Sequence, residues 1–148
     1  MSFSIIINEL QYRLFAIAVA CIFSYNVAAQ TSNSREQLEN NIEEVNKVLP
    51  VSVQQGMVFV KKYISENSVY EIHEIYEQYV SFSLLSKKGK TMKRTLLKRY
   101  SEDPRLISFA MLVVDCNMNI VVNYVSKQTK ETFQLVLSTK DLIKCLNK

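Results

Sequence analysis

Glycine, proline and histidine are scarce in this sequence, and the shortages of glycine and histidine each argue against a class of function. The 148 residues include two glycines, two prolines, one histidine and no tryptophan. Two glycines leave little room for the tight turns that wrap phosphate groups, which disfavours nucleotide-binding loops. The one histidine, His73, would have to serve any Ser-His-Asp or Cys-His arrangement, and no nucleophile elbow accompanies it. We therefore expect a protein that is not an enzyme.

The nearest approach to a metal-binding motif is the segment from His73 to Glu77. Zinc proteases hold the metal with two histidines one helical turn apart and use the glutamate between them as a base. In this chain Glu77 stands where the second histidine would be, and the segment has the composition of a strand. Glu71 and Glu74 fall on opposite faces of that strand, so they would not flank one bond. The sequence thus predicts no catalytic residue, no metal site and no cofactor.

Long apolar runs are missing as well. The longest, at 14–23, has ten residues, about half the length that crosses a hydrocarbon core. Arg13 precedes this run and the small residues Val27-Ala28-Ala29 follow it, a pattern typical of a secretory signal peptide. We expect cleavage after Ala29, which divides the chain into a signal peptide at 1–29 and a single α+β domain at 30–148.

Two alternatives to a cleaved signal stay open. One is a buried helix or an uncleaved anchor, because Glu9 makes the first segment less basic than usual. The other is lipid attachment at Cys21, although the apolar run continues beyond this cysteine. Export predicts a periplasmic or secreted protein and disfavours nucleic acid as a partner. The formal charge of +4 is mild and bears on solubility, not on fold.

Export would also place Cys116 and Cys145 where disulfides persist. An even count permits one bridge, which would close a loop of about thirty residues and contribute about 3 kcal/mol. Two separate buried thiols are an equal alternative, since spacing along the chain does not fix the distance between two Cα atoms.

The first half of the domain predicts one helix and one hairpin. Ser34-Arg35-Glu36-Gln37 reads as a capping box, and apolar residues recur at helical spacing until Pro50 ends the helix. The segments 57–64 and 69–76 are rich in β-branched and aromatic residues and flank a turn-like polar stretch. These two segments therefore predict an antiparallel pair of strands.

The faces of the second strand follow from its tyrosines. The alternation of this segment is less regular than in the later strands, and we expect Tyr70, Ile72 and Tyr76 to share the inward face. This phase turns Glu71 and His73 outward, toward solvent.

The second half of the domain predicts two helices, a hairpin and a short closing helix. The stretch 87–100 carries seven basic residues and no acid, with Met92, Leu96 and Tyr100 four residues apart, as in a basic amphipathic helix. Asp103-Pro104 then begins an apolar helix. The segments 118–125 and 131–137 alternate apolar and polar residues and predict two half-buried strands. Ser138-Thr139 caps the last helix.

The order of these elements predicts an α+β fold. The segments 35–76 and 104–137 each read as a helix followed by a hairpin. We expect two helix-plus-hairpin units that form a four-stranded antiparallel sheet, with the helices packed on one face, because a hairpin alone is only marginally stable.

The chain also resembles a loose group of small exported bacterial proteins of unknown function. The resemblance is carried by Asn46-Lys47-Val48-Leu49-Pro50, the basic helix, Glu102-Asp103-Pro104, Asn123-Tyr124 and Ser138-Thr139-Lys140-Asp141. Some relatives carry two cysteines at positions that correspond to Ser101 and Leu142, so their bridge is absent from this chain. The resemblance implies an envelope location and an α+β architecture, and it supplies no catalytic residues.

The basic helix at 87–99 is the main candidate for a binding site. We single out Lys87, Lys90, Arg94 and Lys98, which could contact an acidic partner or an anionic membrane surface. Two simpler interpretations stay open. The cations can be solvated while the apolar stripe packs on the sheet, or they can pair with the acidic block Glu66, Glu71, Glu74 and Glu77.

Three tyrosines are a second candidate for an interface. Tyr63, Tyr76 and Tyr79 would suit protein binding if they met on an exposed face, because each joins an apolar ring to a polar hydroxyl. The preferred hypothesis is an exported protein-binding module, an inhibitor, immunity-type or accessory envelope protein. The alternative is a binder of anionic lipid or glycolipid through the basic helix.

Overall fold

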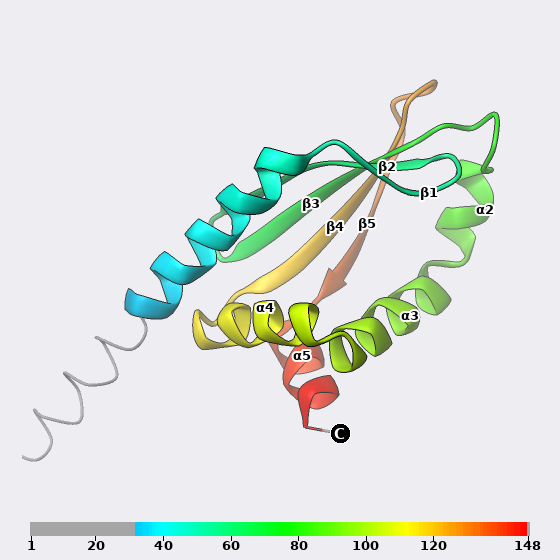
Figure 1. Cartoon of the computed structure of the whole chain (residues 1–148). Coiled ribbons are helices and arrows are strands. Elements are labelled where there is room, and N and C mark those ends of the chain that lie inside the picture. The colour runs from blue at the N-terminus through cyan, green and yellow to red at the C-terminus, as the bar shows by residue number, and fades with distance from the viewer. Residues whose placement is uncertain (1–31, 148) are drawn as a thin grey trace, which may run out of the picture. The chain divides into compact units, whose positions relative to one another are not determined.

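Five strands and a set of helices make up the fold (Figure 1). The computed structural model describes residues 32–147; the predicted signal peptide at 1–29 and Cys21 lie outside them. A helix at 32–48 comes first. The elements that follow are β1 (Val51–Gln54), β2 (Met57–Ser65), β3 (Ser68–Ile75), α2 (Phe82–Lys87), α3 (Gly89–Glu102), α4 (Pro104–Asp115), β4 (Asn119–Ser126), β5 (Thr132–Leu137) and α5 (Thr139–Leu146). From Arg35 onward the chain is one compact unit.

The sheet is mixed and has the strand order β1-β2-β3-β4-β5. Neighbouring strands are antiparallel except β3 and β4, which run parallel from Ser68 opposite Asn119 to Ile75 opposite Ser126. The expectation of four antiparallel strands was therefore wrong, although the α+β class holds. The reason lies in α2, α3 and α4, which together form the long crossover that parallel strands require.

One face of the sheet holds the core. Its buried side chains on the strands are Met57, Val69, Ile75, Ile120, Val122, Tyr124, Leu135 and Leu137. They pack with residues of the helices, among which Leu38, Ala110, Val113 and Leu142 are fully buried. This core agrees with the expectation that the helices pack on one face of the sheet.

The phase of β3 is the opposite of the predicted one. Glu71 and His73 pair with Val122 and Tyr124 of β4, so they share the inner face with these residues, and Tyr70 and Ile72 lie on the outer face. Both faces of β3 carry apolar residues, so alternation alone did not fix the phase. A shift of one residue moves every side chain to the other face.

An irregularity in β2 brings a lysine inside. The register shifts between Phe59 and Lys61, after which Lys62 pairs with Glu71 and lies on the inner face. The extra residue reverses the alternation of the strand beyond it. Lys61 remains exposed, with its Nζ 5.3 Å from the centroid of the Tyr63 ring.

Asn46 joins the helix at 32–48 to β2. Its Nδ2 donates to the carbonyl oxygen of Lys62 at 2.7 Å, and its Oδ1 accepts from the backbone N–H of Lys62 at 3.0 Å. The side chain thus satisfies both backbone groups of Lys62 where β1 does not reach. This contact gives a physical role to the first residue of the Asn46–Pro50 motif.

The strand β1 was not predicted, and Gly56 explains how it forms. This residue sits in the turn to β2 with φ of 79°, a conformation that favours glycine, and its carbonyl accepts from the N–H of Tyr76 at 2.9 Å. A Cβ atom at this position would lie 2.7 Å from Tyr79 Cβ. The turn therefore depends on the missing side chain.

Candidate functional site

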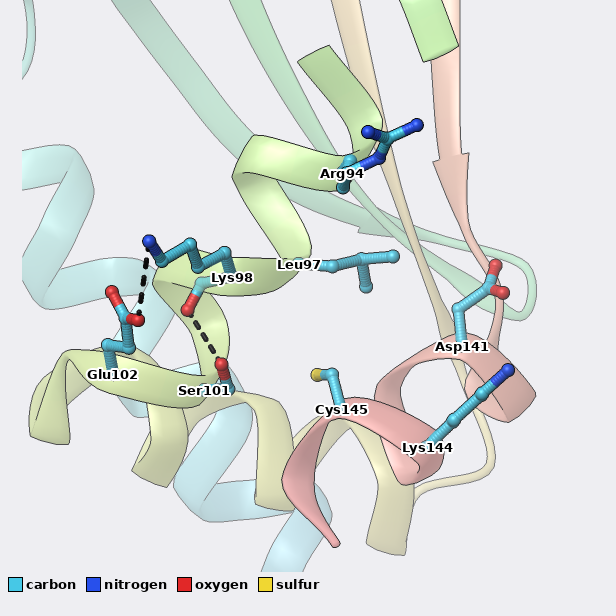
Figure 2. Close-up of a pocket in the computed structure, with 8 residues that line it drawn as sticks. All are labelled: Arg94, Leu97, Lys98, Ser101, Glu102, Asp141, Lys144 and Cys145. Atoms are coloured by element: carbon cyan, nitrogen blue, oxygen red, sulfur yellow. Dashed lines mark hydrogen bonds and ion pairs between the residues drawn. The ribbon is translucent and has the colours of Figure 1, made fainter. Parts of the chain in front are cut away.

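A cleft of about 520 Å³ lies between α3 and α5 (Figure 2). We call it the α3–α5 cleft. It is lined by Arg94, Leu97, Lys98, Ser101 and Glu102 of α3 and by Asp141, Lys144 and Cys145 of α5. Leu97 is half-buried and Cys145 is buried, so they form an apolar floor. Arg94 and Lys144 are exposed and provide positive charge at the rim.

Local sequence features explain which face α3 buries and where α5 begins, and these two helices form the walls of the cleft. Met92 and Leu96 of α3 are half-buried and Tyr100 is buried, which confirms the predicted apolar stripe and turns the opposite face outward. The helix α5 begins with a capping box between Ser138 and Asp141, as the sequence indicated for its N-terminus. The cleft is thus framed by the outer part of one amphipathic helix and the start of another.

A salt bridge ties the two walls together. Lys93 Nζ lies 2.8 Å from Asp141 Oδ2. The same carboxylate oxygen accepts from Ser138 Oγ at 2.8 Å and from the Ser138 N–H at 3.1 Å. The hydrogen bond from Lys93, with that from the Ser138 hydroxyl, lowers the pKa of Asp141 to about 2. Asp141 is therefore ionised at neutral pH and already engaged.

The remaining charges of the cleft are mostly positive. Lys98 lies 3.8 Å from Glu102 in an exposed pair, and in Figure 2 its ammonium turns away from α5 toward that residue. In that view Arg94 lies at the top of the cleft and Lys144 at the lower right, with Asp141 between them. Because Lys93 pairs with Asp141 and Lys98 pairs with Glu102, Arg94 and Lys144 are the charged lining residues for which the described part of the chain shows no ion pair.

The four predicted basic residues separate in the structure. All of Lys87, Lys90, Arg94 and Lys98 are exposed, but only Arg94 and Lys98 line the cleft. Lys90 lies earlier on α3 and Lys87 ends α2.

The acidic block pairs elsewhere than was proposed. Glu71 binds Lys62 and Glu74 binds Lys127 at 3.0 Å. Glu77 accepts from Ser126 Oγ.

The predicted tyrosines do not come together. Tyr63 stacks on Tyr70 on the outer face, with ring centroids 5.2 Å apart. Tyr76 and Tyr79 lie beyond β3, near Gly56 at the opposite end of β2. About six strand residues, or roughly 20 Å, separate the two locations. Tyr63 therefore cannot share one small binding site with Tyr76 and Tyr79.

Sequence reasoning missed the contribution of α5. Lys144 and Cys145 complete the cleft with residues of α3 that lie far earlier in the chain. The available signal was the capped start of α5, which fixes Asp141 in the first turn and hence Lys144 and Cys145 one turn later. The sequence pattern gave no indication that α5 packs beside α3.

Both cysteines stand as thiols in the structure. Cys145 is buried on the cleft side of α5, and Cys116 is half-buried after α4. Burial raises the pKa of the Cys116 thiol above its usual value. A bridge between them stays a prediction.

A second group of polar side chains lies inside the core. Lys62 Nζ is 3.1 Å from Glu71 Oε1, and the Tyr100 hydroxyl donates to the same oxygen at 3.5 Å. Burial is the largest single influence and acts to raise the pKa of Glu71, but Lys62 and His73 together outweigh it and hold the pKa at about 2. Burial, with the Glu71 charge, raises the pKa of Tyr100 well above its usual value. This group is a buried ion pair with its hydrogen-bond partner.

His73 is part of the same interior. Its ring stacks on Phe59 at 4.7 Å between centroids and lies 5.4 Å from Tyr124. Nε2 is 3.7 Å from Glu71 Oε2, longer than a hydrogen bond, and both ring nitrogens are buried. The ring is thus enclosed by aromatic side chains, in contrast to the predicted solvent-facing position.

The described residues contain neither a metal cluster nor a membrane-spanning helix. No three His, Cys, Asp or Glu side chains among residues 32–147 gather as ligands for a metal ion. Within the same residues, no helix has the length and apolar character needed to cross a bilayer.

The fold is similar to that of three proteins of known structure, one described as secreted and two described as secretion-system pilotins. No family model and no curated protein matches the chain. A Pseudomonas aeruginosa protein described as secreted shares 6% identity at a TM-score of 0.61, over 76% of this chain and 96% of its own. The Vibrio vulnificus type 2 secretion pilotin EpsS shares 10% identity at 0.56, over 78% and 96%. The Vibrio cholerae type II secretion pilotin AspS shares 8% at 0.55, over 77% and 96%. At these identities the likeness concerns the fold.

Proposed function

We propose that this chain is an exported accessory protein of the bacterial envelope, which binds another envelope protein and catalyses no reaction. The observation that carries the proposal is the match of its fold to two secretion-system pilotins over 96% of each. The third similar structure, described as secreted, supports the same compartment. The predicted signal peptide at 1–29 supports it independently, from the sequence.

The α3–α5 cleft supports binding over chemistry. Asp141 is held by Lys93 and Ser138, and the Ser101 hydroxyl donates to the carbonyl of Lys98 at 2.7 Å. With these groups engaged, the cleft offers an apolar floor and exposed cations, a combination that suits the core and rim of a protein interface.

Photo-crosslinking in cells tests this proposal. A photoreactive amino acid at Arg94 or Lys144 should give a covalent adduct with a defined envelope protein, because both side chains stand at the cleft. The same amino acid at Glu44, exposed on the helix at 32–48, is the matched control and should give none. The partner would be identified by mass spectrometry and its affinity measured with both proteins purified. Equal adducts at all positions, or none at the cleft, would contradict the proposal.

Anionic lipid remains the second candidate, because α2, α3 and α5 expose many cations. Lys87, Lys90, Arg94, Lys98, Lys140 and Lys144 are all exposed. Such a surface would bind phosphatidylglycerol vesicles with an affinity that falls as salt is added. Cosedimentation of the full chain with these vesicles, compared with phosphatidylcholine vesicles, measures this directly. Equal cosedimentation with both would remove the candidate.

A further inference from the structure

A second hollow borders α5 on its other side. It measures about 300 Å³ and lies between α4 and α5. We call it the α4–α5 groove. Its lining is mostly apolar: Ile107, Met111, Val114, Ile143 and Leu146, with Asp115 and Asn147 at the side.

Two side chains of this groove are unusually exposed for their type. Met111 on α4 is 53% exposed and Ile143 on α5 is 43% exposed. A single exposed apolar residue is ordinary, but two that line one hollow form a local patch. The groove can therefore accept an apolar side chain that would cover both.

The cleft and the groove share α5 as a common wall. Lys144 and Cys145 line the cleft, and Ile143 and Leu146 line the groove. Since a helix with its side chains is about 10 Å across, the two hollows lie about that far apart. An extended segment that crosses α5 covers this distance in about three residues.

We infer that the partner contributes an acidic segment that crosses α5, with acidic side chains against Arg94 and Lys144 and an apolar side chain in the α4–α5 groove. This inference rests on the proposed protein-binding function and adds the chemistry of the bound segment. The acidic side chains follow from charge complementarity. Lys93 already forms an ion pair with Asp141, so Arg94 and Lys144 are the cations that can bind a ligand. The exposed side chains of Met111 and Ile143 favour an apolar side chain of the partner in the α4–α5 groove.

Two other occupants fit this surface less well. A second copy related by a twofold axis would bring together two surfaces that both present Arg94 and Lys144, which is electrostatically unfavourable. A bilayer presents a broad surface, which contacts the ridge of α5 and does not fill two hollows on either side of it. The segment of a protein partner reaches both.

The probe is a random peptide library displayed on phage and selected on the full chain, purified as the cells export it. Enriched peptides should combine acidic residues with an apolar residue about three positions away. The double variant Arg94→Glu with Lys144→Glu should weaken a selected peptide roughly tenfold or more, and added salt should do the same to the unaltered chain. Ile143→Asp should also weaken it, roughly tenfold.

Lys90→Glu is the matched control, because Lys90 is exposed on α3 outside the cleft. It should leave the affinity within about twofold, and circular dichroism checks that every variant folds. Basic or purely apolar enriched peptides, or affinities indifferent to both sets of changes, would overturn the inference. So would binding to phosphatidylglycerol vesicles that the same charge reversals abolish while no peptide is enriched. A crosslinked partner that still binds after both charge reversals would leave the proposed function standing and remove this inference alone.

Discussion

Replacement of Lys62 by methionine should lower the free energy of unfolding by about 3–5 kcal/mol, because it leaves Glu71 as a buried carboxylate without its cation. The two side chains are 6% and 12% exposed, and their charged atoms lie 3.1 Å apart. Lys62 Nζ also lies 3.4 Å from the centroid of the Phe109 ring, a cation–π contact that the variant loses. Methionine retains the length and the apolar stem, so the change isolates the charge.

The pKa of Glu71 gives the net stabilisation of its charged form, in which Lys62 and His73 together outweigh the effect of burial. The value of about 2, against a usual 4.5, corresponds to roughly 3–4 kcal/mol in favour of the charged form, at about 1.4 kcal/mol per pH unit. Because the folded pKa is the lower one, this stabilisation is present above pH 4.5 and is lost as the pH falls from 4.5 toward 2. In Lys62→Met, most of that acid-dependent loss should disappear.

Urea unfolding followed by circular dichroism, at neutral pH and in steps down to pH 3, measures both effects. The control is Lys61→Met, since Lys61 is the exposed neighbour on β2 and should change stability by less than about 1 kcal/mol. The double variant Lys62→Met with Glu71→Leu should recover most of the loss, because it removes the unpaired charge. A loss below about 1 kcal/mol in Lys62→Met would refute the assignment of a buried ion pair.

Two further changes test the connections around β2. Asn46→Ala should destabilise the domain by about 1–3 kcal/mol in urea unfolding, because both backbone groups of Lys62 lose their partner. Asn46→Asp keeps the acceptor but sets a carboxylate oxygen against the Lys62 carbonyl, so it should cost at least as much, and a clearly smaller loss would count against this reason. Gly56→Ala should cost more than about 1–2 kcal/mol in thermal unfolding, since alanine meets both a positive φ and the Tyr79 Cβ at 2.7 Å. An unchanged melting temperature would show that the turn can relax.

The sequence predicted the elements better than their pairing. Caps and periodicity located the other helices, as at Ser138, Asp103 and the apolar stripe of α3, but not α2, since these signals act within one or two turns. The parallel contact of β3 with β4 depends on where a three-helix crossover returns the chain, and no local pattern records that path. The fold class was therefore accessible, while the sheet order was only partly so.

Local sequence patterns also could not predict which face of β2 carries Lys62 or which residues complete the α3–α5 cleft. In β2 the shift between Phe59 and Lys61 places Lys62 inside, although a lysine between strand residues normally indicates solvent. The basic helix drew attention to Arg94 and Lys98, but the cleft exists because α5 brings Lys144 beside them. Local composition identified one wall, and tertiary packing supplied the other.

The parallel pairing at the centre of the sheet has a consequence for how the molecule is made. Ser68 meets Asn119 only after the whole crossover has been synthesised, so the hairpin β2–β3 waits for its neighbour through three intervening helices. Long-range partners of this kind form slowly, because the entropy of closing the loop is lost before any contact forms. The polypeptide should thus stay loosely structured until nearly all of it has emerged, which is the state that the proposed export through a translocation channel would require.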